Sequence, residues 1–197
     1  AVVSDQNTRD VMGKRIETAL ATIGSIDSVV LDHPHADEAQ VTALRDRLRH
    51  ADAVVAVGSG TINDLCKYVT AADKRSYCVF GTAPSMNGYT SANASITFDG
   101  HKRSVPAALA RGVFVDLEVL AAAPVRLIRA GLGDSLCRST AQVDGLLSHC
   151  LLGTPYRTTP FALLAADEPM LLDAAAEHVA GDAAAMRALA RTLVLSG

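Results

Sequence analysis

The sequence predicts an α/β fold in which a parallel β-sheet covered by helices is followed by further helices. Up to about residue 121, short apolar runs rich in β-branched residues alternate with segments of helical periodicity. The runs are apolar on both faces, which is typical of parallel strands buried between two layers of helices. From residue 125 onward the chain is rich in Ala and Leu and has no recognisable strand. We therefore expect an α/β domain over residues 1–121 and the first helices of an all-α domain over residues 122–197.

The first part of the predicted sheet contains two strand–helix units. The apolar runs AVVSD and SVVLD have the length and composition of strands. Each precedes a segment with apolar residues at helical spacing, residues 8–23 and residues 38–48. Gly24 follows the first of these helices, at a position where glycine commonly ends a helix.

The second part contains the clearest strand, ADAVVAVG, which runs into a glycine-rich turn. TINDLCKYVTAA predicts a helix that starts at this turn, and SYCVFGT predicts the next strand. SANASITFDGHKRSV predicts a two-stranded hairpin that turns at Asp99-Gly100, because that dipeptide favours tight hairpin turns. GVFVDLEVL, residues 112–120, predicts the last strand of the domain.

Composition and charge exclude several classes of protein. The net charge is -3 with no block of Lys or Arg, and 4% of residues are aromatic, so nucleic acid is not an expected partner. No apolar run approaches the ~20 residues that span a bilayer, and the first residues do not resemble a signal peptide, so we expect a cytoplasmic protein with no membrane partner. The four cysteines form no CxxC pair, and we expect buried free thiols. Both chain ends fall inside predicted elements and look cut.

The first candidate site is the turn from Gly58 to Asp64, with the sequence GSGTIND. Glycine lets a backbone approach a phosphate closely, and the free N–H groups of the first helical turn can hold its charge. The spacing matches neither the GxGxxG pattern nor a P-loop. The alternative is a tight strand–helix turn that binds no ligand.

Two further segments carry polar groups toward the same region. TAPSMNGYTS, residues 82–91, follows the next strand, and the carboxyl ends of parallel strands are where such sheets bind ligands. The alternative is an ordinary polar loop. Asp134 lies in AGLGD, early in the helical part. Its carboxylate can ligate a divalent cation, and the alternative is a helix N-cap.

The three segments together resemble the sn-glycerol-1-phosphate dehydrogenases. These belong to a wider superfamily with the iron-containing alcohol dehydrogenases, the glycerol dehydrogenases and the dehydroquinate synthases. The strings GSGTIND, TAPSMNGYTS and AGLGDSL carry the resemblance, which extends from about Ala1 to His149. It implies a Rossmann-like, dehydroquinate synthase-like fold. It also implies the reversible reduction of dihydroxyacetone phosphate to sn-glycerol 1-phosphate, with a metal as Lewis acid and a nicotinamide as hydride donor.

The resemblance also implies roles for individual residues. The residues that match the cradle of the cofactor pyrophosphate are Gly58, Ser59, Gly60, Thr61 and Ile62. Those that match the nicotinamide side are Thr82, Ala83, Pro84, Ser85 and Ser91. Asp5 looks like the residue that contacts the adenosine ribose, and its charge favours NAD over NADP. Asp134 looks like the carboxylate that ligates the catalytic metal and faces the substrate. The metal is expected to be zinc, with nickel or iron in some members.

The sequence departs from the family's pattern at two positions. Asn87 stands where the family commonly has an Asp that faces the substrate, and Arg138 stands where a Lys often follows the metal ligand. The two His that complete the family's metal site are expected beyond Gly197. His33 and His35 flank a proline, and we expect them at the surface, far from the three segments. His149 is expected to be a packed or capped histidine.

Two other functions remain open from the sequence. The first is a lyase similar to dehydroquinate synthase, although the Lys and Arg residues that would hold a carboxylate and a phosphate were not found. The second is a truncated, non-catalytic nucleotide-binding protein, which an exposed apolar patch would distinguish. For the dehydrogenase, the resemblance implies a homodimer that acts on a phosphorylated triose or polyol.

Overall fold

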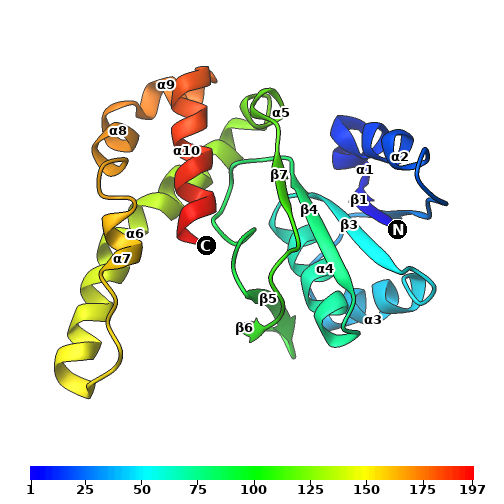
Figure 1. Ribbon diagram of the computed structural model, residues 1–197, viewed down its shortest axis with the longest axis horizontal. Coiled ribbons are helices and arrows are strands. Elements are labelled where there is room, and N and C mark those ends of the chain that lie inside the picture. The colour runs from blue at the N-terminus through cyan, green and yellow to red at the C-terminus, as the bar shows by residue number, and fades with distance from the viewer.

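A five-stranded parallel sheet, ordered β2-β1-β3-β4-β7, forms the centre of the first part of the chain (Figure 1). The computed structural model describes residues 1–197, apart from the side chain of Leu172. The strands of this sheet are β1 (Val2–Asp5), β2 (Ser28–Leu31), β3 (Ala53–Gly58), β4 (Ser76–Gly81) and β7 (Val113–Val115). The predicted α/β class with a parallel sheet is confirmed.

Helices cover both faces of the sheet, as the apolar strands predict. Val3 packs in one core with Leu44 of α3 (Glu38–Arg47) and Leu65 of α4 (Gly60–Ala72). Val2 faces the opposite way, because successive strand residues point to opposite faces. It packs with Met12 in a second core, which also includes residues of α2 (Lys14–Leu20) and α5 (Leu117–Ala121). Sequence alternation along the strands therefore divides the apolar residues between two layers.

The predicted helix over residues 8–23 is divided into three segments. These are α1 (Gln6–Thr8), a π-helical turn η1 (Arg9–Gly13) and α2 (Lys14–Leu20). Met12 and Gly13, two adjacent residues of the π-helical turn, are both buried. A wider turn changes which residues face the sheet, an irregularity that 3.6-residue periodicity alone does not predict.

The predicted hairpin forms a separate two-stranded antiparallel sheet of β5 (Asn93–Phe98) and β6 (His101–Pro106). Asp99 and Gly100 both have positive φ, 51° and 77°, as a tight hairpin turn requires. The hairpin also contacts the loop before α3, because the N–H of Thr97 donates to the carbonyl of Ala36 at 2.8 Å. This contact brings the hairpin over the carboxyl ends of the strands.

The prediction of a strand over residues 112–120 is wrong beyond Val115. The strand β7 ends there, and α5 (Leu117–Ala121) begins two residues later. Asp116 causes the change, because its carboxylate accepts a hydrogen bond from the N–H of Glu118 at 2.9 Å and caps the helix. The apolar residues after it then turn toward the helical layer, and Leu120 is buried there.

The rest of the chain is helical and lies to one side of the sheet in Figure 1. Its longest element is α6 (Val125–Leu152), which ends at Gly153 with a φ of 67°. The remaining helices are α7 (Thr159–Ala162), α8 (Glu168–Asp173), α9 (Ala175–Ala180) and α10 (Ala183–Ser196). The end of α10 returns to the loop after β4, where the hydroxyl of Thr90 donates to the carbonyl of Val194 at 2.8 Å. Among the described residues, no helix is both long and apolar enough to cross a membrane.

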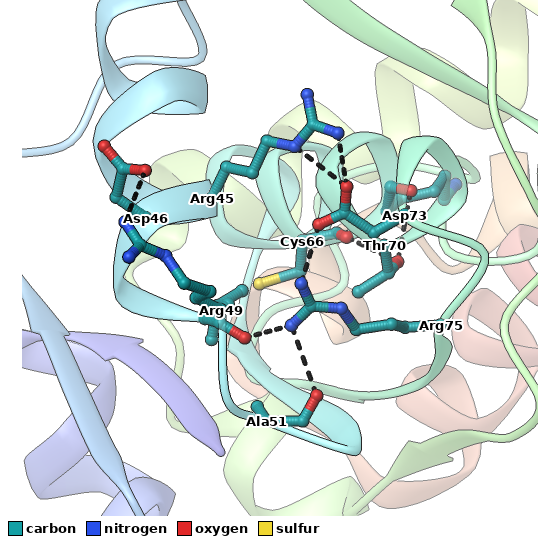
Figure 2. A network of polar contacts seen from close by, with 10 residues as sticks. Arg45, Asp46, Arg49, Ala51, Cys66, Thr70, Asp73 and Arg75 are labelled. Atoms are coloured by element: carbon teal, nitrogen blue, oxygen red, sulfur yellow. Dashed lines mark hydrogen bonds and ion pairs between the residues drawn. The ribbon is translucent and has the colours of Figure 1, made fainter.

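A network of ion pairs closes the edge of the sheet where the strands begin, and Figure 2 shows it. We call it the Asp73 network. The carboxylate of Asp73 lies 2.6 Å from Nη2 of Arg45 and 2.8 Å from Nη2 of Arg75. Arg75 also donates to the carbonyls of Leu48 and Ala51. The network therefore joins the ends of α3 and α4 to the loop before β3.

The prediction of buried thiols is correct only for Cys66, which is buried in α4; burial raises the pKa of its thiol. Cys78 is half-buried in β4. Cys137 and Cys150 are exposed on α6. Because α6 is in contact with other elements along only part of its surface, its periodicity does not bury every apolar position.

Candidate functional site

A cleft of about 700 Å³ lies at the edge of the sheet where the strands end. Five parts of the chain form it: the loop before α3, the start of α4, the loop of residues 82–91, the β5–β6 hairpin and the first turns of α6. Residues of all three segments that the sequence singles out therefore meet in one place. The predicted site residues that line it are Ser59, Gly60, Thr61, Ser85, Asn87, Ser91 and Asp134.

The N-terminus of α4 points free backbone donors toward this cleft. Ser59 is the N-cap residue, but its side chain makes no capping hydrogen bond. By contrast, the carboxylate of Asp37 caps α3 by accepting from the N–H of Gln40 at 2.9 Å. A helix without a side-chain cap retains N–H groups for an external acceptor, and its dipole favours an anion.

Two glycines of the turn have different functions. A Cβ atom at Gly58 would lie 2.7 Å from the side chain of Ile62, so this glycine permits the tight strand–helix packing. A Cβ atom at Gly60 would meet only the sulfur of Met86, at an ordinary contact distance of 3.5 Å. Gly58 and Ile62 are buried beneath the turn, whereas Gly60 faces the cleft.

In the loop of residues 82–91, the first residues are buried and the later ones face the cleft. Thr82, Ala83 and Pro84 are buried. Tyr89 lies beneath them and donates from its hydroxyl to the carbonyl of Ala83 at 2.8 Å. Burial raises the pKa of Tyr89, which keeps the phenol protonated as a donor. Its packing holds the loop so that the polar residues further along, including Ser85, face the cleft.

Asp134 lies within α6, so the alternative of an N-cap is wrong. Its Oδ2 accepts a hydrogen bond from the backbone N–H of Asn87 at 2.7 Å. Gly131 permits this approach, because a Cβ atom there would lie 1.7 Å from the carbonyl oxygen of Pro84. The helix therefore rests directly on the backbone of the loop, one turn before Asp134.

Lys67 is a supporting residue that the sequence motifs did not identify. It is fully buried in α4, and its ammonium group donates to the carbonyls of Gly88, Ser91 and Asn93 at 2.5, 2.7 and 3.2 Å. Burial lowers the pKa of Lys67, and the nearby carboxylate of Asp64 opposes this shift. The lysine fixes the end of the loop. A lysine within the buried stretch of an otherwise apolar helix is the signal that could have identified it.

Asp64 lines the cleft next to this lysine. Its carboxylate accepts from the backbone N–H of Ser95 at 3.1 Å and from the side chain of Asn63 at 2.9 Å. Burial raises the pKa of Asp64, while the Ser95 N–H and the charge of Lys67 oppose the shift. The residue joins α4 to the hairpin.

Comparison with known proteins identifies the family of this chain. Residues 1–124, more than half of the chain, match the family described as iron-containing alcohol dehydrogenase. The chain belongs to this family. It is 31% identical to the glycerol-1-phosphate dehydrogenase [NAD(P)+] of Bacillus licheniformis and 30% identical to that of Pyrococcus furiosus, over its whole length. It spans 51% and 57% of these two relatives, about half of their length.

Its fold is also that of a solved glycerol dehydrogenase. The structure from Schizosaccharomyces pombe superimposes on 100% of the chain with a TM-score of 0.82 and 20% sequence identity. The chain covers 54% of that structure. The predicted fold, a Rossmann-like sheet followed by helices, is confirmed for this member of the iron-containing alcohol dehydrogenase family.

Asp5 is separate from the other predicted site residues of this family member. It closes β1, and its carboxylate accepts from the N–H of Thr8 at 2.8 Å while the Thr8 hydroxyl accepts from the N–H of Asp5. This reciprocal pair caps α1. Asp5 is not among the residues that line the cleft.

The histidines differ in part from their predicted positions. The prediction that His35 is far from the three segments is wrong, because it lines the same cleft as Ser59 and Gly60. The loop that carries it is drawn there by the backbone contact with the hairpin. His33 is exposed, as predicted. His149 lies on α6 itself, with Nδ1 2.7 Å from the carbonyl of Thr154.

The residues that the structure describes include no group of three or more His, Cys, Asp or Glu side chains able to hold a metal ion. Asp134 supplies one carboxylate, and Oδ2 of that carboxylate already accepts a hydrogen bond. A catalytic zinc site normally has three protein ligands. The described residues alone therefore do not form a complete metal centre.

Proposed function

We propose that this chain is the nucleotide-binding part, with the beginning of the helical part, of an NAD(P)- and metal-dependent oxidoreductase. The proposed reaction interconverts dihydroxyacetone phosphate and sn-glycerol 1-phosphate. The observation that supports it most is the meeting of the α4 N-terminus, the loop of residues 82–91 and Asp134 in one cleft. Two of the chain's curated relatives, named as glycerol-1-phosphate dehydrogenases, supply the choice of substrate.

We assign the cofactor to the α4 side of the cleft. The free N–H groups of Gly60 and Thr61 suit the pyrophosphate, because donors and a helix dipole act on it together. Ser85 and Ser91 then lie on the nicotinamide side. A bound nicotinamide supplies the hydride. We assign the ribose contact to Asp5, whose charge favours NAD over NADP. To make this contact its side chain would rotate and give up the hydrogen bond that caps α1.

We assign the substrate and the metal to the α6 side. Asp134 would be one ligand of a divalent metal, with zinc favoured over nickel or iron, because its carboxylate is held by Asn87 at the cleft. The side chain of Asn87 would contact the substrate hydroxyls. As an amide it can both donate and accept there, without the charge of an aspartate.

We propose that residues 1–121 form the nucleotide-binding domain and residues 122–197 the start of the metal and substrate domain. The relatives are about twice as long as the chain, and α6 has a face of exposed apolar residues that further helices would cover. Members of this face are Leu136, Val143, Leu147 and Leu151. We further propose a cytoplasmic homodimer.

The test is Gly60→Ala, measured by calorimetric titration with NADH. The protein can accommodate the added methyl group, since its nearest neighbour is the flexible side chain of Met86 at 3.5 Å. A bound pyrophosphate would not accommodate it, so affinity should fall about tenfold or more, equivalent to about 1.4 kcal/mol. The control is Gly24→Ala, where an added Cβ meets nothing within 4 Å. Unchanged NADH affinity in Gly60→Ala would reject the assigned turn.

A further inference from the structure

A second cavity of about 520 Å³ lies among the helices, between α6, α7 and the end of α10. We call it the arginine cavity, because Arg138 and Arg157 line it. Phe161, Leu164 and Ser196 form part of the remaining wall. Among its described lining residues, no side chain carries a carboxylate. The lining side chains are therefore uncharged apart from two cations.

Arg138 occupies this cavity with much of its hydrogen-bonding capacity unused. Its side chain is 13% exposed. One terminal nitrogen, Nη2, pairs with the carboxylate of Glu168. Its Nε and Nη1 atoms are buried and have no hydrogen-bond partner in the described part of the chain. Buried N–H groups without an acceptor are costly, and those on a charged group more so.

Among the side chains around the cavity, the charge balance is positive and favours an anion. Glu168 balances one positive charge, and Arg157 adds a second without a carboxylate partner among the described ion pairs. A phosphate oxygen is a strong acceptor for guanidinium N–H groups. It would satisfy the unused donors of Arg138 and offset the excess charge in one step.

The arginine cavity adjoins the cleft through a single residue. The backbone N–H of Asn87 donates to Asp134, which lines the cleft, and its side chain donates to the carbonyl of Ser196, which lines the arginine cavity. Asp134 and Arg138 are four residues apart on α6 and share one face of the helix. A rise of about 6 Å along the helix axis, slightly more than one turn, separates them. That separation is comparable to the length of a triose phosphate.

We propose that Arg138, assisted by Arg157, forms the subsite for the phosphate group of the substrate. This inference rests on the proposed function, because it takes the carbonyl end of the substrate to lie at Asp134. It also explains which substrates the site would accept. Phosphorylated trioses and polyols bind, whereas their unphosphorylated counterparts lack the group that Arg138 holds. The cofactor phosphates remain at the separate anion site on α4.

The experiment is a titration of the 197-residue chain with inorganic phosphate, followed by phosphorus NMR, with and without saturating NADH. NADH occupies the α4 end and removes phosphate binding there. The test variant is Arg138→Met combined with Glu168→Gln, so that no carboxylate is left without its partner. The matched control is Arg129→Met, an exposed arginine on the same helix.

We expect saturable phosphate binding that the double variant weakens about tenfold or more and the control leaves unchanged. NADH affinity should be equal in all three proteins, which shows that the variants fold. Equal phosphate affinity in wild type and double variant, or no saturable binding by the wild type, would overturn the subsite. If the wild type does not bind NADH but does bind phosphate in a way that depends on Arg138, the proposed function would instead be overturned.

Discussion

The two edges of the central sheet carry polar clusters of opposite character. At the edge where the strands begin, the carboxylate of Asp73 is paired with Arg45 and Arg75, and Arg75 also holds two backbone carbonyls (Figure 2). At the edge where the strands end, Ser59 leaves the helix uncapped and Gly60 leaves the backbone open. In the first cluster the polar groups pair with one another. In the second the polar groups remain unpaired and face the cleft, where a ligand can bind them.

The helix α4 spans both edges, so the contrast lies within one element. Its last turn is fixed by the Asp73 network, and its first turn is left unsatisfied by the protein. Backbone N–H groups that have no partner in the folded protein are available to a ligand. Leaving them unpaired lowers the stability of the fold, and other interactions must offset this loss. Changes at the edge where the strands begin should therefore affect stability alone. Changes at the edge where the strands end should affect both stability and ligand binding.

The largest effect is expected for Gly131→Ala. The added Cβ would overlap the carbonyl of Pro84, so α6 and the loop must separate, and the free energy of unfolding should fall by about 2–3 kcal/mol. Urea denaturation measures this. At Gly133 a Cβ meets nothing within 4 Å, so Gly133→Ala should be neutral or stabilise by up to about 1 kcal/mol. Equal stability of the two variants would contradict the close approach.

The next effect is expected for Lys67→Met, at the cleft edge. Three loop carbonyls lose their shared donor, so the free energy of unfolding should fall by about 2 kcal/mol and NADH affinity should fall with it. Denaturation and titration on the same sample measure both. Lys14→Met, at an exposed position, serves as the control. Lower stability with unaltered NADH affinity would make Lys67 a purely structural residue.

At the opposite edge, Asp73→Ala should lower the free energy of unfolding by about 1.5 kcal/mol, because two arginines lose a shared carboxylate. NADH affinity should not change, since the network lies at the far end of α4. Asp46→Ala removes an exposed ion pair of the same helix layer and should cost no more than about 0.5 kcal/mol. An effect of Asp73→Ala on NADH affinity would break the contrast between the edges.

The smallest effect concerns the pH dependence of Asp64. Because burial raises its pKa above 3.8 in the folded protein, its contribution to stability is full below pH 3.8 and is lost as pH rises through the folded pKa. Asp64→Asn removes this dependence, so the free energy of unfolding of the variant should rise relative to that of the wild type as pH rises through the folded pKa. Lys14 lowers the pKa of Asp10, so Asp10→Asn should show the opposite sign. A flat difference for Asp64→Asn would contradict the shift.

Local sequence patterns predict the elements well where one residue decides the structure. Asp99-Gly100 predicts the hairpin turn, and the apolar runs predict all five strands of the sheet. The last of them, β7, is shorter than predicted for a local reason, because Asp116 can cap a helix as well as end a strand. The pattern of apolar residues alone does not distinguish those two outcomes.

The site is predicted less completely, because its assembly depends on distant contacts. Ser59, Asn87 and Asp134 meet as the motifs suggest. His35 joins them only because the β5–β6 hairpin contacts the loop before α3, and no local pattern encodes that contact. Lys67 is identified by its burial and its acceptors, which come from residues more than twenty positions away.

The contact at Gly131 has a consequence for how sequence change affects the site. Distances set by packed side chains vary as those side chains are substituted or change rotamer. At Gly131 the distance is set by one main chain resting on another, with no side chain between them. The position of Asp134 relative to Asn87 is therefore insulated from substitutions in α7 to α9. Those helices can diverge widely while the spacing between these two residues stays constant.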